Sequence, residues 1–407
     1  MLLTPLLALL AALPALAEQA VLEQEPWQAK YGGTPDLTFS GVAGFGRLPH
    51  AVCLDEPGRG FDIAVLGMPF DTTVSYRPGA RFGPHGIRTG SRRIGPARSF
   101  IYGWGFSPAQ DSGLEIIDCN DVPVSPYDPA LAIDEMQVAY QTLLARPVST
   151  PDASFTRHLA KDGKEHPRIL TLGGDHTIVL PILGALSEVY GPITVLHFDA
   201  HLDTWNGHEL GGAHTEQHKT THGTFFWKAH ELGYINNATS AHAGIRTRLS
   251  SMADLLHDEA VGFRVYSTDD IDELGAEGVA SALKKRLGNG PVYLSFDIDT
   301  IDPSMAPATG TPESGGWTTR EVKRIVRGLH GLNIVGADIV EVSPAYDTNA
   351  ELTTMAAADL AMEFLALMTS KDGPIPASKK GVLNAGLKAK IAKERAAAAA
   401  KAERDEL

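Results

Sequence analysis

The sequence predicts an α/β fold in which helices cover both faces of a parallel β-sheet. Short, continuous apolar runs recur through the middle of the chain and alternate with helix-like stretches. Such runs are typical of strands that are buried on both faces, and their alternation with helices favours a parallel sheet. Charged and coordinating residues also follow several of the runs, at the strand ends where parallel sheets form binding sites.

The expected strands are apolar runs whose lengths suit buried strands. They lie at residues 63–66, 114–117, 169–172, 193–198, 241–245, 263–266, 292–296 and 334–340. The expected helices are the longer stretches between these runs. They include residues 129–145, 178–189, 252–257, 276–287 and 318–330.

Two of the expected strands lead into closely spaced acidic and histidine residues. Asp199, His201 and Asp203 follow the run at 193–198, and Asp297 and Asp299 follow the run at 292–296. Residues two apart in a strand point to the same face, so each set is expected to project together. Charged groups at such places cost free energy unless something compensates them. A pair of divalent cations is the simplest occupant, because carboxylates can bridge two metals.

A sixth candidate ligand, His176, follows the run at 169–172 through a turn that contains Gly173 and Gly174. Mixed histidine and carboxylate ligands suit manganese, iron or zinc better than calcium. For any one of these residues an ordinary surface charge or a structural histidine would be the simpler interpretation. The six together favour a metal site.

Several motifs, in order along the chain, resemble the ureohydrolase family of arginases and agmatinases. They are RPGARFGPHGIR (77–88), GGDHT (173–177), HFDAHLD (197–203), SFDIDTIDP (295–303), ATGTPESGG (308–316) and DIVEVSPAYD (338–347). The resemblance covers roughly residues 61–367. It implies a three-layer α/β/α arginase-like fold with an eight-stranded parallel sheet and a site for two Mn²⁺ ions per subunit.

The resemblance also implies which residues hold each ion. One Mn²⁺ would be held by His176, Asp199, Asp203 and Asp297. The other would be held by Asp199, His201, Asp297 and Asp299, so that Asp199 and Asp297 bridge the two ions.

The expected chemistry is hydrolysis of a guanidinium group. Two cations lower the pKa of a bridging water and supply hydroxide near neutral pH, which adds to the guanidinium carbon. The leaving amine then needs a proton from a general acid, a role that the resemblance gives to His222. It makes Glu341 the guanidinium-binding carboxylate, and the second oxygen of Asp203 is placed to orient the hydroxide. The simpler alternatives are a polar loop residue for His222 and a structural ion pair for Glu341.

The expected reaction is the hydrolysis of agmatine to putrescine and urea. The motif RPGARFGP (77–84) resembles the agmatinase branch, and the segment between Asp203 and His222 does not match the arginase pattern for gripping an amino-acid carboxylate. Trp205, in this segment, either lines the pocket or covers the sheet edge. Guanidinobutyrate and arginine remain alternative substrates. A zinc deacylase or a non-catalytic metal-binding homologue is also possible, but the complete set of six ligands argues against both.

Composition agrees with a soluble globular protein that acts on a small cation. The chain has 407 residues, of which 43% are hydrophobic and 21% charged. A formal net charge of −14 argues against a nucleic-acid partner and is compatible with a cationic substrate, although a surface kept soluble by acidic charge explains it equally well. No membrane span is expected, and a homo-oligomer is expected from the family resemblance alone.

The two ends of the chain predict entry into the secretory pathway. Residues 1–17 resemble a cleavable signal peptide, and Arg404-Asp405-Glu406-Leu407 is a variant of the retention signal of the endoplasmic reticulum. We therefore expect a lead-in at 18–60, a catalytic domain at 61–375 and an Ala- and Lys-rich tail at 376–407. The expected location is the lumen of the endoplasmic reticulum, with secretion as the alternative.

Two further features matter only in such a compartment. Cys53 and Cys119 are the two cysteines of the chain, and an oxidising lumen would allow them to pair, although nothing in the sequence places them close together. Asn237-Ala238-Thr239 matches the acceptor pattern for N-glycosylation.

Overall fold

The computed structural model describes residues 26–33, 37–95, 98–210 and 214–376, together with single positions 389, 392, 393, 395 and 396. The expected signal peptide at 1–17 and the expected retention signal at 404–407 lie outside these residues. The chain divides into two units, one up to Val42 and one from Ala43 onward. The first unit contains the short helix α1 (Pro26–Tyr31), and the second contains every other element described below.

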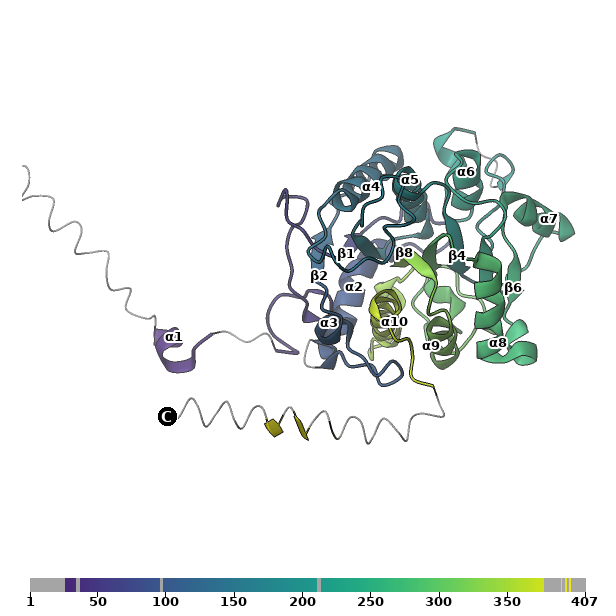
Figure 1. Cartoon of the computed structure of the whole chain (residues 1–407). Helices are drawn as coiled ribbons and strands as arrows, with labels where there is room; N and C mark the ends of the chain where they lie inside the picture. Colours follow the sequence, from purple (N-terminus) through teal and green to yellow (C-terminus); the bar gives the residue numbers. More distant parts are fainter. Residues whose placement is uncertain are drawn as a thin grey trace, which may run out of the picture. The chain divides into compact units, whose positions relative to one another are not determined.

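The second unit is built on one parallel sheet of eight strands in the order β2-β1-β3-β8-β7-β4-β5-β6 (Figure 1). The strands are β1 (Ile63–Met68), β2 (Ile116–Asp121), β3 (Arg168–Gly173), β4 (Thr194–Phe198), β5 (Ala241–Ile245), β6 (Val265–Ser267), β7 (Pro291–Phe296) and β8 (Asn333–Ile339). Every neighbouring pair is parallel, as the strand and helix alternation predicts.

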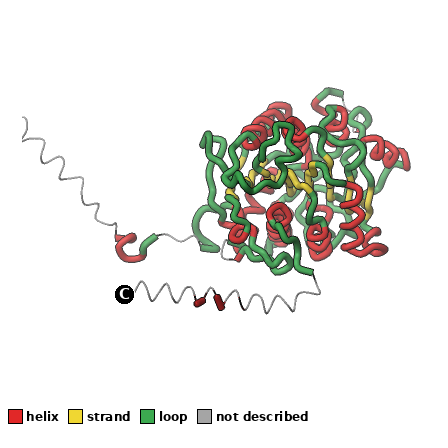
Figure 2. Tube along the Cα trace, in the orientation of Figure 1, coloured by secondary structure: helices red, strands yellow, loops and turns green. Residues whose placement is uncertain are grey.

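Helices cover both faces of this sheet (Figures 1 and 2). They are α2 (Gly83–Gly90), α3 (Pro108–Asp111), α4 (Pro129–Leu144), α5 (Val179–Tyr190), α6 (Phe225–Glu231), α7 (Met252–Val261), α8 (Asp270–Leu287), α9 (Thr319–Gly328) and α10 (Leu352–Thr369). Helices α4, α5 and α6 share one apolar core with the sheet, and α8, α9 and α10 share the other. This arrangement confirms the three-layer α/β/α fold.

The strands supply both cores because their side chains alternate between the two faces of the sheet. Ile63 and Val65 of β1 belong to the core with α8, α9 and α10, whereas Ala64 and Leu66 belong to the core with α4, α5 and α6. All six residues of β1 are buried. This is why the strands read as continuous apolar runs in the sequence.

Helix α10 is long and apolar enough to cross a membrane, by length and composition. In the structure, 78% of this helix is buried inside the domain. It packs against α2 and α9 and contributes Phe364 to the core. Its apolar character is therefore that of a core helix.

The position expected for the second strand is wrong by a few residues. The sequence places it at 114–117, but β2 begins at Ile116 and continues to Asp121. The second half of β2 contains polar residues, so this strand does not read as a continuous apolar run in the sequence. Asp118 is buried because its carboxylate accepts from the Arg88 Nε at 2.8 Å, and Cys119 is buried in a disulfide.

Two helices begin or end at residues other than those expected from the sequence. Helix α7 continues to Val261, beyond the expected end at 257, and the carboxylate of Asp258 in this last turn is buried and hydrogen-bonded. Helix α8 is assigned from Asp270, but Gly275 interrupts it with a φ of 67°. Glycine tolerates this left-handed conformation, and the regular part of the helix starts at Ala276, as expected.

The segment before β1 is part of the sheet domain. Cys53 and Cys119 form a disulfide, with Cα atoms 5.0 Å apart, which ties this segment to β2. The Phe45 side chain is fully buried in the same unit. The structure therefore joins residues 43–60, expected in the lead-in, to the domain that carries the site.

Candidate metal centre

The candidate ligands come together because four central strands end at the same edge of the sheet. His176 follows β3, Asp199 to Asp203 follow β4, and Asp297 and Asp299 follow β7. Glu341 follows β8. The sheet order β3-β8-β7-β4 makes these strands neighbours, so residues far apart in the sequence meet at their carboxyl ends.

The first ligand group surrounds one nitrogen of His176. The Nδ1 of His176 lies 3.1 Å from the Asp199 Oδ2, 3.2 Å from the Asp203 Oδ2 and 3.4 Å from the Asp297 Oδ2. All four side chains are buried. Three carboxylate oxygens around one imidazole nitrogen form a set of donors that a divalent cation can occupy.

Hydrogen bonds behind His176 orient its ring toward this group. The Nε2 of His176 lies 2.7 Å from the Ser295 Oγ, which in turn donates to the Asp338 Oδ1 at 3.1 Å. Ser295 Oγ therefore accepts from the Nε2–H. Burial alone would lower the pKa of His176, but the three carboxylates raise it, so a cation bound at Nδ1 would take the place of a proton there. This Nδ1 is buried without a hydrogen-bond partner and faces the carboxylates, as a metal ligand would.

The second ligand group lies on the other side of Asp199. The Nδ1 of His201 lies 3.1 Å from the Asp199 Oδ1 and 3.0 Å from the Asp299 Oδ2. Asp199 thus presents Oδ2 to the first group and Oδ1 to the second, which is the geometry of a bridging carboxylate. Asp297 is placed in the first group, and its Oδ1 accepts from the Asp299 N–H at 2.7 Å.

The electrostatics of the carboxylates fit a cationic occupant. Burial raises the pKa of Asp203 to about 6, and the negative charge of Asp199 adds to this effect. Burial also raises the pKa of Asp297 well above its ordinary value, together with the charges of Asp299 and Asp199. A divalent cation removes this mutual repulsion and compensates the buried charges. The residues present therefore fit a divalent metal cofactor.

Two residues of the site hold unusual backbone conformations. Asp203 has a φ of 56° and Glu341 a φ of 61°. The left-handed region is costly for residues other than glycine and persists where the surrounding structure enforces it. Both residues lie at the carboxyl edge of the sheet, where the conformation directs their side chains into the site.

The carboxylate of Glu341 has one occupied and one free oxygen. Its Oε1 accepts from the His176 backbone N–H at 2.9 Å and lies 3.1 Å from the His222 Nδ1. Its Oε2 is buried and has no hydrogen-bond partner. A buried carboxylate oxygen without a partner is costly, so this atom is available for a cationic or hydrogen-bonding ligand.

His222 connects Glu341 to the loop that contains Ser75. Burial alone would lower the pKa of His222, but the hydrogen bond and charge of Glu341 outweigh it and raise the pKa to about 9. At its other nitrogen, Nε2 lies 2.7 Å from the Ser75 Oγ and accepts from the Ser75 N–H at 3.0 Å. The hydroxyl can donate to or accept from Nε2, whereas the Ser75 N–H can only donate and therefore favours an Nε2 without a proton.

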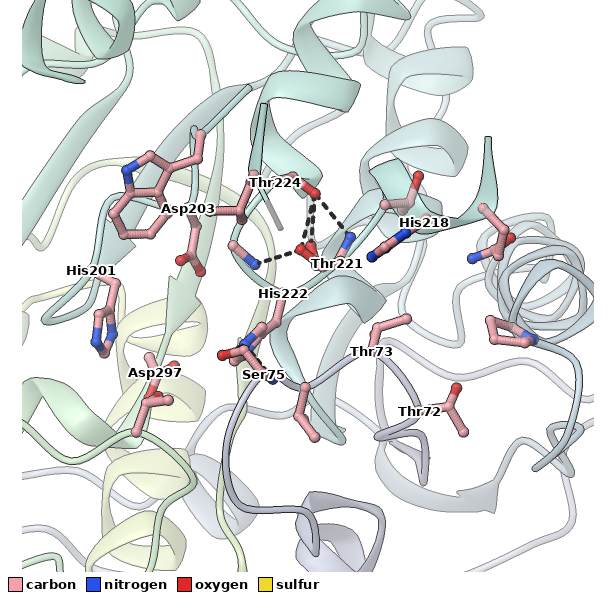
Figure 3. Close-up of a pocket in the computed structure, with 18 of the residues that line it drawn as sticks. Thr72, Thr73, Ser75, His201, Asp203, His218, Thr221, His222, Thr224 and Asp297 are labelled. Atoms are coloured by element: carbon pink, nitrogen blue, oxygen red, sulfur yellow. Dashed lines mark hydrogen bonds between the residues drawn. The ribbon is translucent and has the colours of Figure 1, made fainter. Parts of the chain in front are cut away.

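Ser75, His201, Asp203, His222 and Asp297 line a cavity of about 730 Å³. Figure 3 shows His201, Asp203 and Asp297 on one side of it, with His222 and Ser75 beside them. Trp205 and Leu210 form part of the apolar wall, so the structure assigns Trp205 to the pocket rather than to the sheet edge. Among the described residues that line the cavity, none is Lys or Arg.

Sequence reasoning missed the residues that support the ligands. Ser295 precedes Asp297 by two positions on β7, and His197 precedes Asp199 by two positions on β4. The same period of two that identified the ligands could have indicated both residues. Ser75 has no comparable signal, because it reaches the site from a loop after β1.

The Arginase family model matches residues 61–367 of the chain. The chain belongs to the arginase family. Among curated proteins, this arginase-family chain is 48% identical over 338 residues to "Putative agmatinase 1" of Schizosaccharomyces pombe, covering 82% of this chain and 84% of the relative. It is 35% identical over 337 residues to a guanidinobutyrase of Pseudomonas aeruginosa, covering 83% and 95%. A solved structure described as a hypothetical agmatinase from Burkholderia thailandensis matches with a TM-score of 0.67 and 36% identity, covering 83% of this chain and 93% of that one.

Proposed function

We propose that this arginase-family protein hydrolyses agmatine to putrescine and urea with two Mn²⁺ ions. The observation that carries the proposal is the free Oε2 of Glu341, buried beside the two ligand groups. A guanidinium is a planar cation that pairs well with a carboxylate, so this atom is a natural anchor for it. The name of the Schizosaccharomyces pombe relative, a putative agmatinase, supports the same substrate.

The metal ions would be held by the two ligand groups that share Asp199. The first consists of His176, Asp199, Asp203 and Asp297, and the second of Asp199, His201 and Asp299, to which Asp297 would be added as a second bridging carboxylate. Mixed imidazole and carboxylate donors suit Mn²⁺, which supports manganese over calcium. When bound, two such ions supply a Lewis-acidic centre that lowers the pKa of a water molecule.

Glu341 would orient the substrate. Its Oε1 is held by the His176 N–H and by His222, so the carboxylate cannot rotate freely. Its Oε2 would accept from a guanidinium N–H and keep the guanidinium carbon beside the ligand groups. A charge-assisted hydrogen bond in a buried site is stronger than a neutral one, and this one also fixes the position of the reacting carbon.

His222 would protonate the leaving amine. Against the effect of burial, the hydrogen bond and charge of Glu341 raise the pKa of His222 to about 9, which favours the imidazolium, and the Ser75 hydroxyl is placed to exchange a proton with Nε2. We expect the His222→Asn variant to lose roughly 100- to 10,000-fold in kcat, the usual contribution of general acid catalysis, while it retains its metal. Steady-state kinetics of urea release and metal analysis measure the two quantities.

The same assignment predicts the pH dependence. The imidazolium loses its proton as the pH rises, so kcat/KM of the native protein should fall as the pH passes about 9. His222→Asn should lack this alkaline decline, because it carries no titrating group at that position. An unchanged decline in the variant would assign the proton to another residue.

The cavity favours a substrate without a carboxylate. Agmatine carries an ammonium group at the end distal to its guanidinium, whereas arginine and guanidinobutyrate carry a carboxylate. Among the described lining residues there is no Lys or Arg to pair with that carboxylate, and apart from the candidate ligand His201 only His218 and His222 could do so. Moving a substrate carboxylate from water into the cavity without a cationic partner is costly. The net charge of −14 on the protein also repels an anionic group.

The proposal is tested by urea release from agmatine, guanidinobutyrate and arginine, with the protein loaded with Mn²⁺. We expect kcat/KM for agmatine to exceed the other two by at least roughly 100-fold, the effect of one unpaired buried charge. Guanidinobutyrate is the second candidate, because the Pseudomonas aeruginosa relative bears its name. Preference for guanidinobutyrate would keep the chemistry and overturn the substrate.

We also propose that the protein works in the endoplasmic reticulum, with secretion as the alternative. The Cys53–Cys119 disulfide supports an oxidising compartment. The test expresses the full chain in a eukaryotic cell and measures glycosidase sensitivity, which reports on Asn237, together with cell fractionation. A cytosolic protein with reduced cysteines would overturn the proposal. A homo-oligomer is expected as well, and sedimentation velocity would contradict it by showing a monomer.

A further inference from the structure

Behind Asp199, a row of three buried side chains joins the metal centre to helix α7. The Nε2 of His197 lies 3.0 Å from the Asp199 Oδ2. The Nδ1 of His197 lies 2.7 Å from the His242 Nδ1, and the His242 Nε2 lies 2.8 Å from the Asp258 Oδ1. These residues come from β4, β5 and α7, and the reaction described above uses none of them directly.

The row is rigid because aromatic rings enclose it. His242 stacks on Phe263, with ring centroids 4.1 Å apart and planes 12° apart. His197 meets the Phe226 ring edge-on at 4.8 Å. Both imidazoles are fully buried, so neither ring can turn to water for its hydrogen bonds. Two buried imidazoles and a buried carboxylate are costly unless the arrangement serves a purpose.

Asp258 anchors the far end of the row and also reaches the metal centre by a second route. Its Oδ1 accepts from the Thr204 Oγ1 at 2.7 Å, in addition to its contact with His242. Thr204 directly follows Asp203, the ligand whose φ of 56° requires support from its surroundings. One carboxylate on α7 is thus linked to two of the three ligands that follow β4, Asp199 and Asp203.

We propose that His197, His242 and Asp258 are positioning residues that hold Asp199 ready to bind divalent cations. The two oxygens of Asp199 are approached from different sides: Oδ1 accepts from the His201 N–H at 2.6 Å, and Oδ2 lies 3.0 Å from the His197 Nε2 without a hydrogen bond between them. A preorganised carboxylate binds a cation without first losing conformational freedom, and partners behind the ligands typically contribute 10- to 100-fold in affinity. This inference rests on the divalent-metal centre and does not depend on the identity of the substrate.

The test measures the affinity of the metal-free full chain for Mn²⁺ by competition with a chelator, in the absence of substrate. His197→Phe keeps an aromatic ring against Phe226 but removes the nitrogen beside Asp199. We expect it to weaken Mn²⁺ binding roughly 10- to 100-fold. Once Mn²⁺ is saturating, KM for agmatine should stay close to that of the native protein.

Variants at Asp258 separate the positioning role from a merely structural one. Asp258→Leu should weaken Mn²⁺ binding, whereas Asp258→Asn should restore much of it, because the amide oxygen can still accept from His242 and Thr204. His166→Phe is a matched control, since His166 bonds to Leu144 and Asp162 away from the metal centre. It should bind Mn²⁺ like the native protein.

Thermal unfolding of the metal-free variants completes the test. If His197→Phe or Asp258→Leu bind Mn²⁺ with native affinity, the proposal is overturned, and a lowered Tm alone would then mark a structural role. Should His197→Phe fail to fold, the pair of Asp258 variants decides the question. Because no substrate is present, failure to hydrolyse agmatine would overturn the proposed function and leave this result standing.

Discussion

The Asp199→Asn variant is expected to lose both its divalent metal and its turnover. Asp199 faces the first ligand group with Oδ2 and the second with Oδ1, so it serves both. An amide retains one oxygen but replaces the other with an NH2 group that has no lone pair for a metal. Without the metal ions the transition state loses several kcal/mol of stabilisation, which corresponds to a decrease of roughly 1,000-fold or more in kcat.

Metal analysis of the purified variant and a urea assay measure the two losses. Asp152→Asn provides the matched control, because Asp152 is exposed on the surface, and it should behave like the native protein. An Asp199→Asn protein with full metal content and full activity would contradict the shared-ligand arrangement.

The Glu341→Gln variant should keep its metal and lose most of its catalytic efficiency. The amide oxygen can still accept from the His176 N–H, but the negative charge that pairs with the guanidinium is gone. Removing one partner of a buried charge pair costs about 2–5 kcal/mol, which is roughly 30- to 5,000-fold in kcat/KM. Both the rise in KM and the fall in kcat are measured by steady-state urea release.

Glu341→Gln should also change the pH profile through His222. The carboxylate of Glu341 raises the pKa of His222 to about 9 against the opposing effect of burial. Without that charge the imidazolium is less favoured, so its pKa falls and the alkaline decline of kcat/KM moves to lower pH. A native kcat/KM with an unmoved decline would exclude Glu341 from both roles.

Much of this fold is visible in the sequence because a doubly covered parallel sheet has a simple pattern. β5 at Ala241–Ile245 lies where the apolar run predicts it, and β1 and β7 agree to within a few residues. The exception is β2, whose second half contains Asp118 and Cys119. Its partners, Arg88 and Cys53, are distant in the sequence, so tertiary contacts decide its burial.

The candidate site, like the fold, is predictable from the sequence only in part. The ligands after β4 and β7 are recognisable because a spacing of two places them on one face of a strand. Glu341 has no such repeat and was identified through the family resemblance alone. The link from Asp199 to Asp258 could not be foreseen, because it depends on β5 lying next to β4 and on α7 packing behind them.

The most direct test of the central claim is a titration of the metal-free chain with Mn²⁺, in which bound metal and urea release from agmatine are measured on the same samples. The two ligand groups that share Asp199 predict that urea release rises to its plateau as the second equivalent of Mn²⁺ binds. A plateau at one equivalent would contradict the two-metal centre. Full occupancy by two equivalents without any urea would contradict the proposed hydrolysis.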